Sequence, residues 1–247
     1  MLCEDEDRPE ATDEAPGTPD RAPGFAPRRL FGRRKGVRLS PTQERRTRAG
    51  LERLSLDLSA PCPADPRALF ARPVSMLRME VGFGGGEHLA HEMACEPETG
   101  FIGAEPFLNG ITALLTTLER EGRDDANLRL HRGDAGEVLD WLPAACLTRI
   151  DVLYPDPWPK LRHRERRFVR PDNLARMTRA LAPGAELRIA SDVPDYIAWA
   201  RRHADAAEGL ILVSHEATPW ADWPGTRYEA KAYREGRRPA YLIYRRA

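Results

Sequence analysis

The chain has 247 residues, with 38 basic and 38 acidic side chains and a formal net charge of zero. Its length suits one sizeable α/β domain with added arms and is short for two full domains. Four cysteines without a Cys-x-x-Cys pair do not support a disulfide-stapled fold and indicate a reducing compartment. No apolar run reaches the roughly 18–20 residues that span a bilayer, and the acidic first residues are unlike a secretory signal, so we expect a cytoplasmic protein.

The neutral total hides an uneven distribution of charge. Residues 1–20 carry eight acids and one base, Arg8, whereas the rest of the chain carries 37 bases and 30 acids, a net charge of +7. A polyanionic partner interacts with the electrostatic field of the folded part of the chain. The net charge of zero over the whole chain therefore does not exclude nucleic acid as a partner.

The first 72 residues show two different compositions. Residues 1–27 are rich in proline, glycine, alanine and acids, with almost no apolar periodicity, and we predict a disordered acidic tail. Residues 28–72 are predicted to be a basic arm, in which six bases and no acid occur from Arg28 to Arg38. Pro41 to Leu58 follows as a charged helix or an irregular segment. The basic run has two interpretations, a solvated charge run or an RNA-contacting arm.

Residues 73–247 are predicted to form the main domain, because short apolar runs alternate there with helical stretches. This alternation is typical of repeated βα units around a parallel sheet. The expected strands are Met76–Val81, Gly100–Ala104, Asn127–His131, Arg149–Leu153, Ala185–Ala190, Leu210–Ser214 and Ala240–Tyr244. The expected helices are Glu87–Cys95, Phe107–Arg120, Gly136–Leu142, Pro171–Leu181 and Pro194–Ala207. We predict an α/β fold with a doubly wound, mostly parallel, seven-stranded sheet of the Rossmann-like class.

A glycine-rich segment follows the first expected strand. Its glycines, Gly82 and Gly84 among them, lie where the strand ends and a helix begins, so the backbone there can approach a ligand closely. Glu105 follows the second strand, where a carboxylate can accept both ribose hydroxyls of an adenosine moiety. Asp134 follows the third strand and could meet the adenine edge.

Dinucleotide dehydrogenases use a related glycine loop, and a purely structural glycine turn is a further alternative. The spacing here is Gly-x-Gly-x-Gly, and Glu87 places a carboxylate near the helix N-terminus that would have to face a pyrophosphate. The residues therefore favour a cofactor without phosphates, such as S-adenosylmethionine.

The fourth expected strand runs into Tyr154-Pro-Asp-Pro-Trp-Pro-Lys160. Ligands of open α/β sheets bind outside the carboxyl ends of the strands, and three prolines would present Asp156, Trp158 and Lys160 on a stiff platform. The alternative is a rigid turn with a buried tryptophan. A basic stretch from Leu161 to Arg170 follows, suited to phosphate contacts or simply solvated.

Two later segments could face the same crevice: Ala190-Ser191-Asp192 after the fifth strand and Gly225 to Glu229 before the last. The histidines show no metal-ligand spacing, so we expect no metal site and interpret them as structural or surface residues.

The chain resembles the bacterial tRNA (guanine-N7)-methyltransferases, a family of class I S-adenosylmethionine-dependent methyltransferases. The resemblance rests on Tyr154 to Lys160 with the Arg/His cluster after it, and on Thr226-Arg-Tyr-Glu229, and it extends from about Phe31 to the C-terminus. It implies that residues 73–247 are the methyltransferase domain and that the target is the variable-loop guanosine of tRNA.

The resemblance also implies roles for individual residues. Cofactor binding is implied for Glu80, Gly82, Gly84, Glu105, Asp134 and Asp156, with Asp156 also catalytic. Substrate binding is implied for Lys160, Asp192, Thr226, Arg227, Tyr228 and Glu229. Contacts to tRNA are implied for Arg162, His163, Arg164, Arg166 and Arg167. The family's second basic residue after Lys160 is Leu161 here, and Glu165 interrupts the basic run.

Guanine N7 carries a free lone pair, so in-line attack on a sulfonium methyl needs no general base. Asp156 could stabilise the cationic purine or accept hydrogen bonds from guanine N1 and N2, and both roles stay open. An exocyclic-amine methyltransferase and an RNA-binding module with a vestigial cofactor pocket are the alternative functions.

Overall fold

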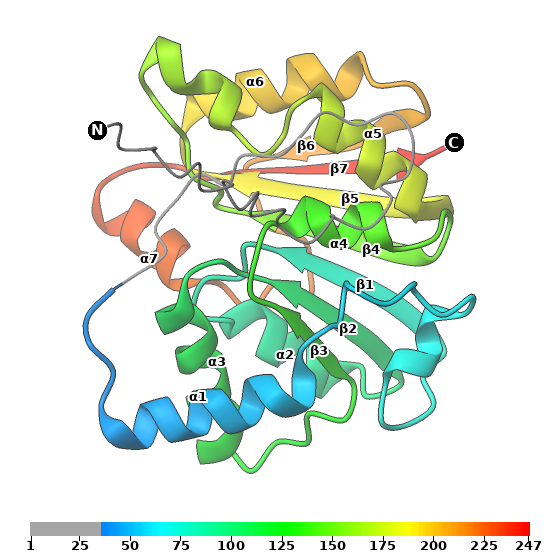
Figure 1. Cartoon of the computed structure of the whole chain (residues 1–247). Helices are drawn as coiled ribbons and strands as arrows, with labels where there is room; N and C mark the ends of the chain where they lie inside the picture. The colour runs from blue at the N-terminus through cyan, green and yellow to red at the C-terminus, as the bar shows by residue number, and fades with distance from the viewer. Residues whose placement is uncertain (1–35) are drawn as a thin grey trace, which may run out of the picture.

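The computed structural model describes residues 36–247, and its centre is one seven-stranded sheet (Figure 1). The strand order is β3-β2-β1-β4-β5-β7-β6. Neighbouring strands from β3 to β5 pair in parallel, and β7 pairs antiparallel with both β5 and β6. The strands are β1 (Met76–Val81), β2 (Thr99–Ala104), β3 (Leu128–His131), β4 (Leu147–Leu153), β5 (Leu181–Ser191), β6 (Leu210–Glu216) and β7 (Ala240–Arg246).

Helices cover both faces of this sheet. Phe101 and Ile102 are neighbours on β2, yet they pack into two different apolar clusters, as the alternation of a strand requires. One cluster is completed by α1 (Pro41–Leu54), α2 (Glu87–Cys95) and α3 (Leu108–Arg120). The other is completed by α4 (Ala135–Trp141), α5 (Pro171–Ala180) and α6 (Pro194–Asp205). The prediction of a doubly wound, mostly parallel sheet is therefore confirmed.

The segment before the sheet begins with a well-capped helix. Ser40 accepts a hydrogen bond from the Gln43 amide while the Gln43 side chain accepts from the Ser40 amide, and Pro41 occupies the first turn. The helix packs against α3, where the hydroxyls of Thr47 and Thr112 lie 2.8 Å apart. Thus α1 belongs to the folded body. The predicted acidic tail and most of the basic run lie outside the described residues.

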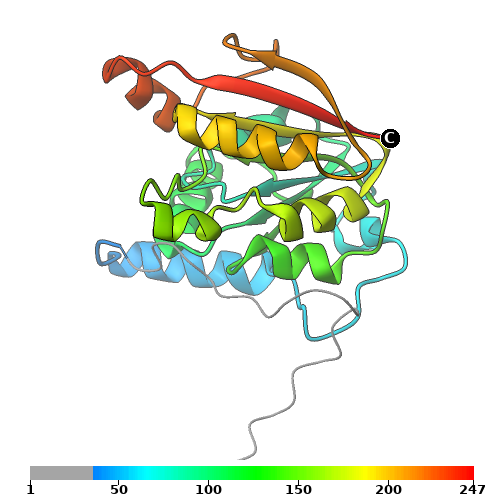
Figure 2. The ribbon, with the colours of Figure 1, turned by 90° about the horizontal axis from the view of Figure 1, so that it is seen from above.

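A short helix, α7 (Arg227–Arg234), precedes the last strand where the sequence pattern predicted only a loop. It and the C-terminus lie at opposite ends of β7 (Figures 1 and 2). Because β7 is antiparallel to β5, α7 lies at the edge of the sheet where the parallel strands end. The first residues of α7 are thereby brought to the predicted ligand-binding edge. Within residues 36–247, no helix is long and apolar enough to cross a membrane.

Candidate active site

A cavity of about 340 Å³ opens at the carboxyl ends of β1, β2 and β4. The glycine loop after β1 forms one wall, and the proline-rich platform after β4 forms another. Most residues predicted for the cofactor line it, together with one residue from α7. The lining includes Gly82, Gly84, Glu105, Asp134, Tyr154, Asp156, Trp158, Arg166, Arg167 and Tyr228.

The glycine loop and the helix behind it, α3, require glycines for two separate reasons. Gly82 and Gly84 have φ values of +66° and +56°, in the left-handed region that side chains disfavour. The loop also passes very close to α3, since a Cβ atom on Gly110 would collide with the carbonyl oxygen of Gly84. The backbone is therefore exposed to a ligand on one side and closely packed on the other.

Glu105 holds this loop in place. One carboxylate oxygen accepts the Gly84 amide at 2.7 Å and the other accepts the Phe107 amide at 2.8 Å. Burial raises the pKa of this carboxyl, and the two backbone hydrogen bonds act against that effect. The carboxylate also occupies a loop amide that a pyrophosphate would otherwise use.

Two further carboxylates reach the cavity from the carboxyl ends of β3 and β4. Asp134 caps α4 by accepting the Gly136 amide at 2.8 Å. Asp156 follows β4 and is open to solvent, although the cavity walls exclude enough water to raise the pKa of its carboxyl. Tyr154 and Trp158 flank it with φ values of +48° and +41°. Such backbone conformations cost energy in residues other than glycine and often occur at functional sites.

Glu80 lies at the same sheet edge but its carboxylate is directed elsewhere. It is 5% exposed and pairs with the Nδ1 atom of His88 at 2.8 Å. Burial alone favours the neutral imidazole, but the carboxylates around it, Glu80 foremost with Asp151 and Glu92, together outweigh burial and raise the pKa of His88. A direct cofactor contact by Glu80 stays a prediction, and its observed role is to anchor the first turn of α2.

In the motif Thr226 to Glu229, which precedes β7, one residue faces the cavity and others hold the motif in place. Thr226 caps α7 by accepting the Glu229 amide at 3.1 Å. Glu229 is buried, and its carboxylate accepts the Trp223 indole N–H at 2.8 Å and the Tyr241 hydroxyl. Tyr228 lines the cavity beside the glycine loop. Of the residues in this motif, Tyr228 is therefore the best placed to contact a substrate.

The remaining predicted substrate residues lie at the margins of the cavity. Lys160 is exposed at the end of the platform. The carboxylate of Asp192 forms an ion pair with Arg237 at 2.9 Å. Arg227 lies 3.5 Å from the Glu87 carboxylate, so it ties the start of α7 to the start of α2.

The basic stretch after the platform forms a 3₁₀ helix, Leu161–Arg166, beside the cavity. Arg162 is exposed, the guanidinium of Arg166 lies over the Trp158 ring at 5.0 Å, and the His163 ring meets that ring edge-on at 5.9 Å. Arg164 pairs with Asp195 at 2.8 Å and remains partly exposed. These residues form a basic rim that leaves cationic groups accessible.

Arg167 differs from its neighbours because it is 1% exposed. It donates to the Pro157 carbonyl at 2.7 Å and pairs with the Asp195 carboxylate. Its guanidinium therefore supports the platform from inside the fold, and the tRNA contact expected of Arg167 stays a prediction.

Comparison with known proteins identifies the family of this chain. A family model described as "Putative methyltransferase" matches residues 75–241. A tRNA (guanine-N(7)-)-methyltransferase of Mesorhizobium japonicum is 48% identical, with 97% of each chain covered. A protein of the same name from Brucella melitensis is 51% identical, with 87% of this chain and 93% of the relative covered. The chain belongs to the tRNA (guanine-N7)-methyltransferase family.

Solved structures support the fold of this methyltransferase. An antibiotic-related methyltransferase superposes with a TM-score of 0.55 at 14% identity, covering 76% of this chain and 96% of that one. The 16S rRNA methyltransferase KamB gives 0.54 at 18% identity, covering 76% and 95%. At these identities the likeness shows the fold alone.

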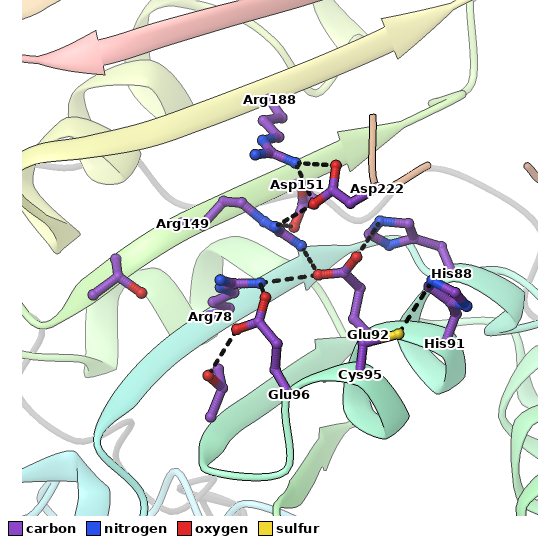
Figure 3. Close-up of polar contacts among 12 residues, drawn as sticks. Arg78, His88, His91, Glu92, Cys95, Glu96, Arg149, Asp151, Arg188 and Asp222 are labelled. Carbon is purple, nitrogen blue, oxygen red and sulfur yellow. Dashed lines mark hydrogen bonds and ion pairs between the residues drawn. The ribbon is translucent and has the colours of Figure 1, made fainter. Parts of the chain in front are cut away.

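A charge network with Arg149 and Asp151 buried at its centre connects α2, β4, β5 and the segment before α7 (Figure 3). Arg149 on β4 donates to Glu92 on α2 and to Asp151 at 2.9 Å, and it lies 3.8 Å from Asp222. Asp222 also accepts from Arg188 on β5 at 3.3 Å. Asp222 precedes α7, so the network ties the segment that leads to Tyr228 onto the sheet.

His88, expected to be a structural or surface residue, is buried against the Trp223 ring, with ring centroids 5.2 Å apart. Tyr154 is the cavity residue that sequence reasoning missed, since in the sequence it is identified only as the start of the Tyr154–Lys160 motif, whereas it lines the cavity. Its position at the end of a strand, directly before the platform, is the signal that could have identified it. Among the described residues, no cluster of three or more His, Cys, Asp or Glu side chains could hold a metal ion.

Proposed function

We propose that this protein transfers a methyl group from S-adenosylmethionine to N7 of guanine in tRNA, giving 7-methylguanosine in the variable loop. The observation that carries the proposal is the identity of about half the residues, over nearly the whole chain, to relatives named for this reaction. The cavity adds independent support, because three carboxylates and a glycine loop converge where a class I methyltransferase would bind its cofactor.

The residues present fit S-adenosylmethionine better than a dinucleotide. Glu105 occupies the Gly84 amide, so the loop presents a carboxylate where a pyrophosphate would need free N–H donors. Glu105 is proposed to bind the ribose hydroxyls and Asp134 the adenine edge. Gly82 and Gly84 allow the methionine portion to lie against the backbone. Glu80 pairs with His88 and so anchors the start of α2, where the loop ends. When bound, this cofactor supplies an electrophilic methyl group on a sulfonium sulfur.

The protein's part in the reaction is to orient the purine and to balance charge. Guanine N7 attacks with its own lone pair, so no side chain has to remove a proton. Fixed orientation can contribute on the order of 7–11 kcal/mol. The purine becomes cationic during transfer, and the carboxylate of Asp156 on its rigid platform is suited to stabilise that charge.

The basic rim is proposed to hold the tRNA backbone. Lys160, Arg162 and Arg166 are placed around the platform, with Arg164 and His163 beside them. Contacts from such groups to phosphates supply affinity without reading sequence, and they set the register of the base that enters the cavity.

The test is methylation of total tRNA with S-adenosylmethionine that carries a labelled methyl group, followed by digestion to nucleosides and mass spectrometry. The label is expected in 7-methylguanosine with the wild type and not with Asp156→Ala. Label in an N-methylated adenosine or N2-methylguanosine would support the exocyclic-amine alternative. Absence of transfer, with intact tRNA binding, would support an RNA-binding module.

A further inference from the structure

Two tyrosine rings face each other at the cavity. Tyr154 directly follows the last residue of β4, and Tyr228 lies in the first turn of α7. Both residues line the same cavity. Their ring centroids are 6.4 Å apart and their planes differ by only 17°. The two rings are therefore nearly parallel, although they come from segments more than seventy residues apart in the sequence.

The separation is informative when compared with the thickness of an aromatic ring. Carbon atoms in contact lie about 3.5–4.0 Å apart, so a flat ring between two others needs roughly 7 Å. The observed 6.4 Å joins the ring centroids, so it is an upper limit on the gap between the two ring planes, and it lies within about 1 Å of that width. A planar base can enter after a small outward movement of one ring.

Both rings are held in place by their surroundings. Tyr154 has a φ of +48°, and its hydroxyl lies 3.4 Å from that of Tyr241, which in turn donates to the buried Glu229. Tyr228 is wedged against the glycine loop, where a Cβ atom on Gly84 would lie 3.2 Å from its ring. The Arg227 guanidinium lies over the Tyr228 ring at 5.1 Å. Tyr154 is therefore the more firmly held ring, and Tyr228, which is 44% exposed, is the ring that can move outward to admit a base.

We propose that Tyr154 and Tyr228 form an aromatic slot that clamps the target purine during methyl transfer. This inference rests on the proposed function and adds Tyr154 as a substrate-contacting residue. The slot lies between the glycine loop and the Asp156 platform, so a base inside it is placed beside both the cofactor position and that carboxylate.

The slot would also bind the transition state more tightly than the neutral substrate. A neutral guanine gains ordinary stacking from the two tyrosine faces, which base–aromatic contacts provide whatever the sequence. As the methyl group arrives the purine becomes cationic, and tyrosine faces attract cations. The interaction thus strengthens along the reaction, which is the kind of binding that raises the rate.

The kinetic test compares Tyr154→Leu, Tyr228→Leu and Tyr154→Phe under single-turnover conditions, with saturating enzyme and S-adenosylmethionine. Loss of one stacking face should slow methyl transfer by roughly 5- to 150-fold in each leucine variant. Phosphate contacts dominate affinity, so the Kd for tRNA should rise less than about threefold. Tyr154→Phe keeps the ring and loses only the hydroxyl contact to Tyr241, and it should recover most of the rate.

A binding test does not depend on the variants folding. Wild-type protein is titrated with guanosine and with cationic 7-methylguanosine by calorimetry, and 7-methylguanosine should bind at least about tenfold more tightly. Equal affinities would overturn the slot even if tRNA is methylated normally, and the proposed function would then stand alone. A wild-type transfer rate in Tyr154→Leu, or an equal loss in Tyr154→Phe, would also overturn it.

Discussion

Replacing Arg149 with methionine would test whether the buried charge network holds the active site together. The Arg149 side chain is only 5% exposed, and it contacts Glu92, Asp151 and Asp222, of which the first two are buried as well. Methionine fills a similar volume but leaves the buried Asp151 without its close counter-charge, and it leaves Glu92 with Arg78 alone as its arginine partner. Breaking a buried pair in this way costs about 3–5 kcal/mol.

For a chain of this size, each kcal/mol corresponds to about 2–4 °C, so the melting temperature should fall by roughly 6–20 °C. The assay is thermal unfolding followed by circular dichroism at several pH values. Unpaired carboxylates have raised pKa values in the folded state, so the deficit of the variant should shrink as the pH falls and they become protonated. Arg120→Met is the matched control, because Arg120 forms an exposed ion pair with Glu121 and should change stability by less than about 1 kcal/mol.

A second change should recover stability if the reasoning is correct. Asp151 has Arg149 as a close charged partner, and one of its carboxylate oxygens is buried without a hydrogen bond. Adding Asp151→Asn to Arg149→Met should therefore restore part of the lost stability, as a double-mutant cycle would show. A variant Arg149→Met that melts with the wild type, or a deficit that grows at low pH, would refute the role assigned to the network.

Three further predictions concern the site itself. Asp156→Asn should nearly abolish methyl transfer without lowering the melting temperature at neutral pH. The raised pKa of Asp156 means that the ionised carboxylate destabilises the folded protein at pH values above that pKa, and asparagine removes this destabilisation. Near wild-type turnover would contradict this. Glu105→Ala should weaken S-adenosylmethionine binding by roughly 2–3 kcal/mol in calorimetry, and unchanged affinity would remove Glu105 from the cofactor site. Replacing Arg162 and Arg166 together with alanine should lower the slope of log affinity for tRNA against log salt by somewhat less than one unit per contact, with turnover at saturating tRNA little changed; an unaltered slope would exclude both from the RNA interface.

The sequence predicted the central strands well because parallel strands covered on both faces read as short, continuous apolar runs. On β4, six of the seven residues are buried, and the expected strand Arg149–Leu153 lies inside it. The glycine loop and Asp156 were also predictable, since each follows directly from such a strand. The central strands, the glycine loop and the position of Asp156 are all determined by residues that are close together in the sequence.

What could not be predicted depends on contacts between distant segments. Helix α7 has eight residues and is held by the burial of Glu229 against Trp223 and Tyr241, which no local pattern reveals. The pairing of Glu92 with Arg149 joins residues 57 positions apart. Composition likewise cannot show which arginine of a basic run turns inward, as Arg167 does.

The central claim is that N7 of guanine is the nucleophile, and one measurement tests it directly. Two transcripts of the same tRNA are compared as methyl acceptors, one with guanosine and one with 7-deazaguanosine at every guanine position, after filter binding has shown that both bind the protein. The 7-deazaguanosine transcript keeps its base-pairing edges but has carbon in place of N7. We predict methyl transfer to the first transcript and none to the second, and comparable transfer to both would contradict the account.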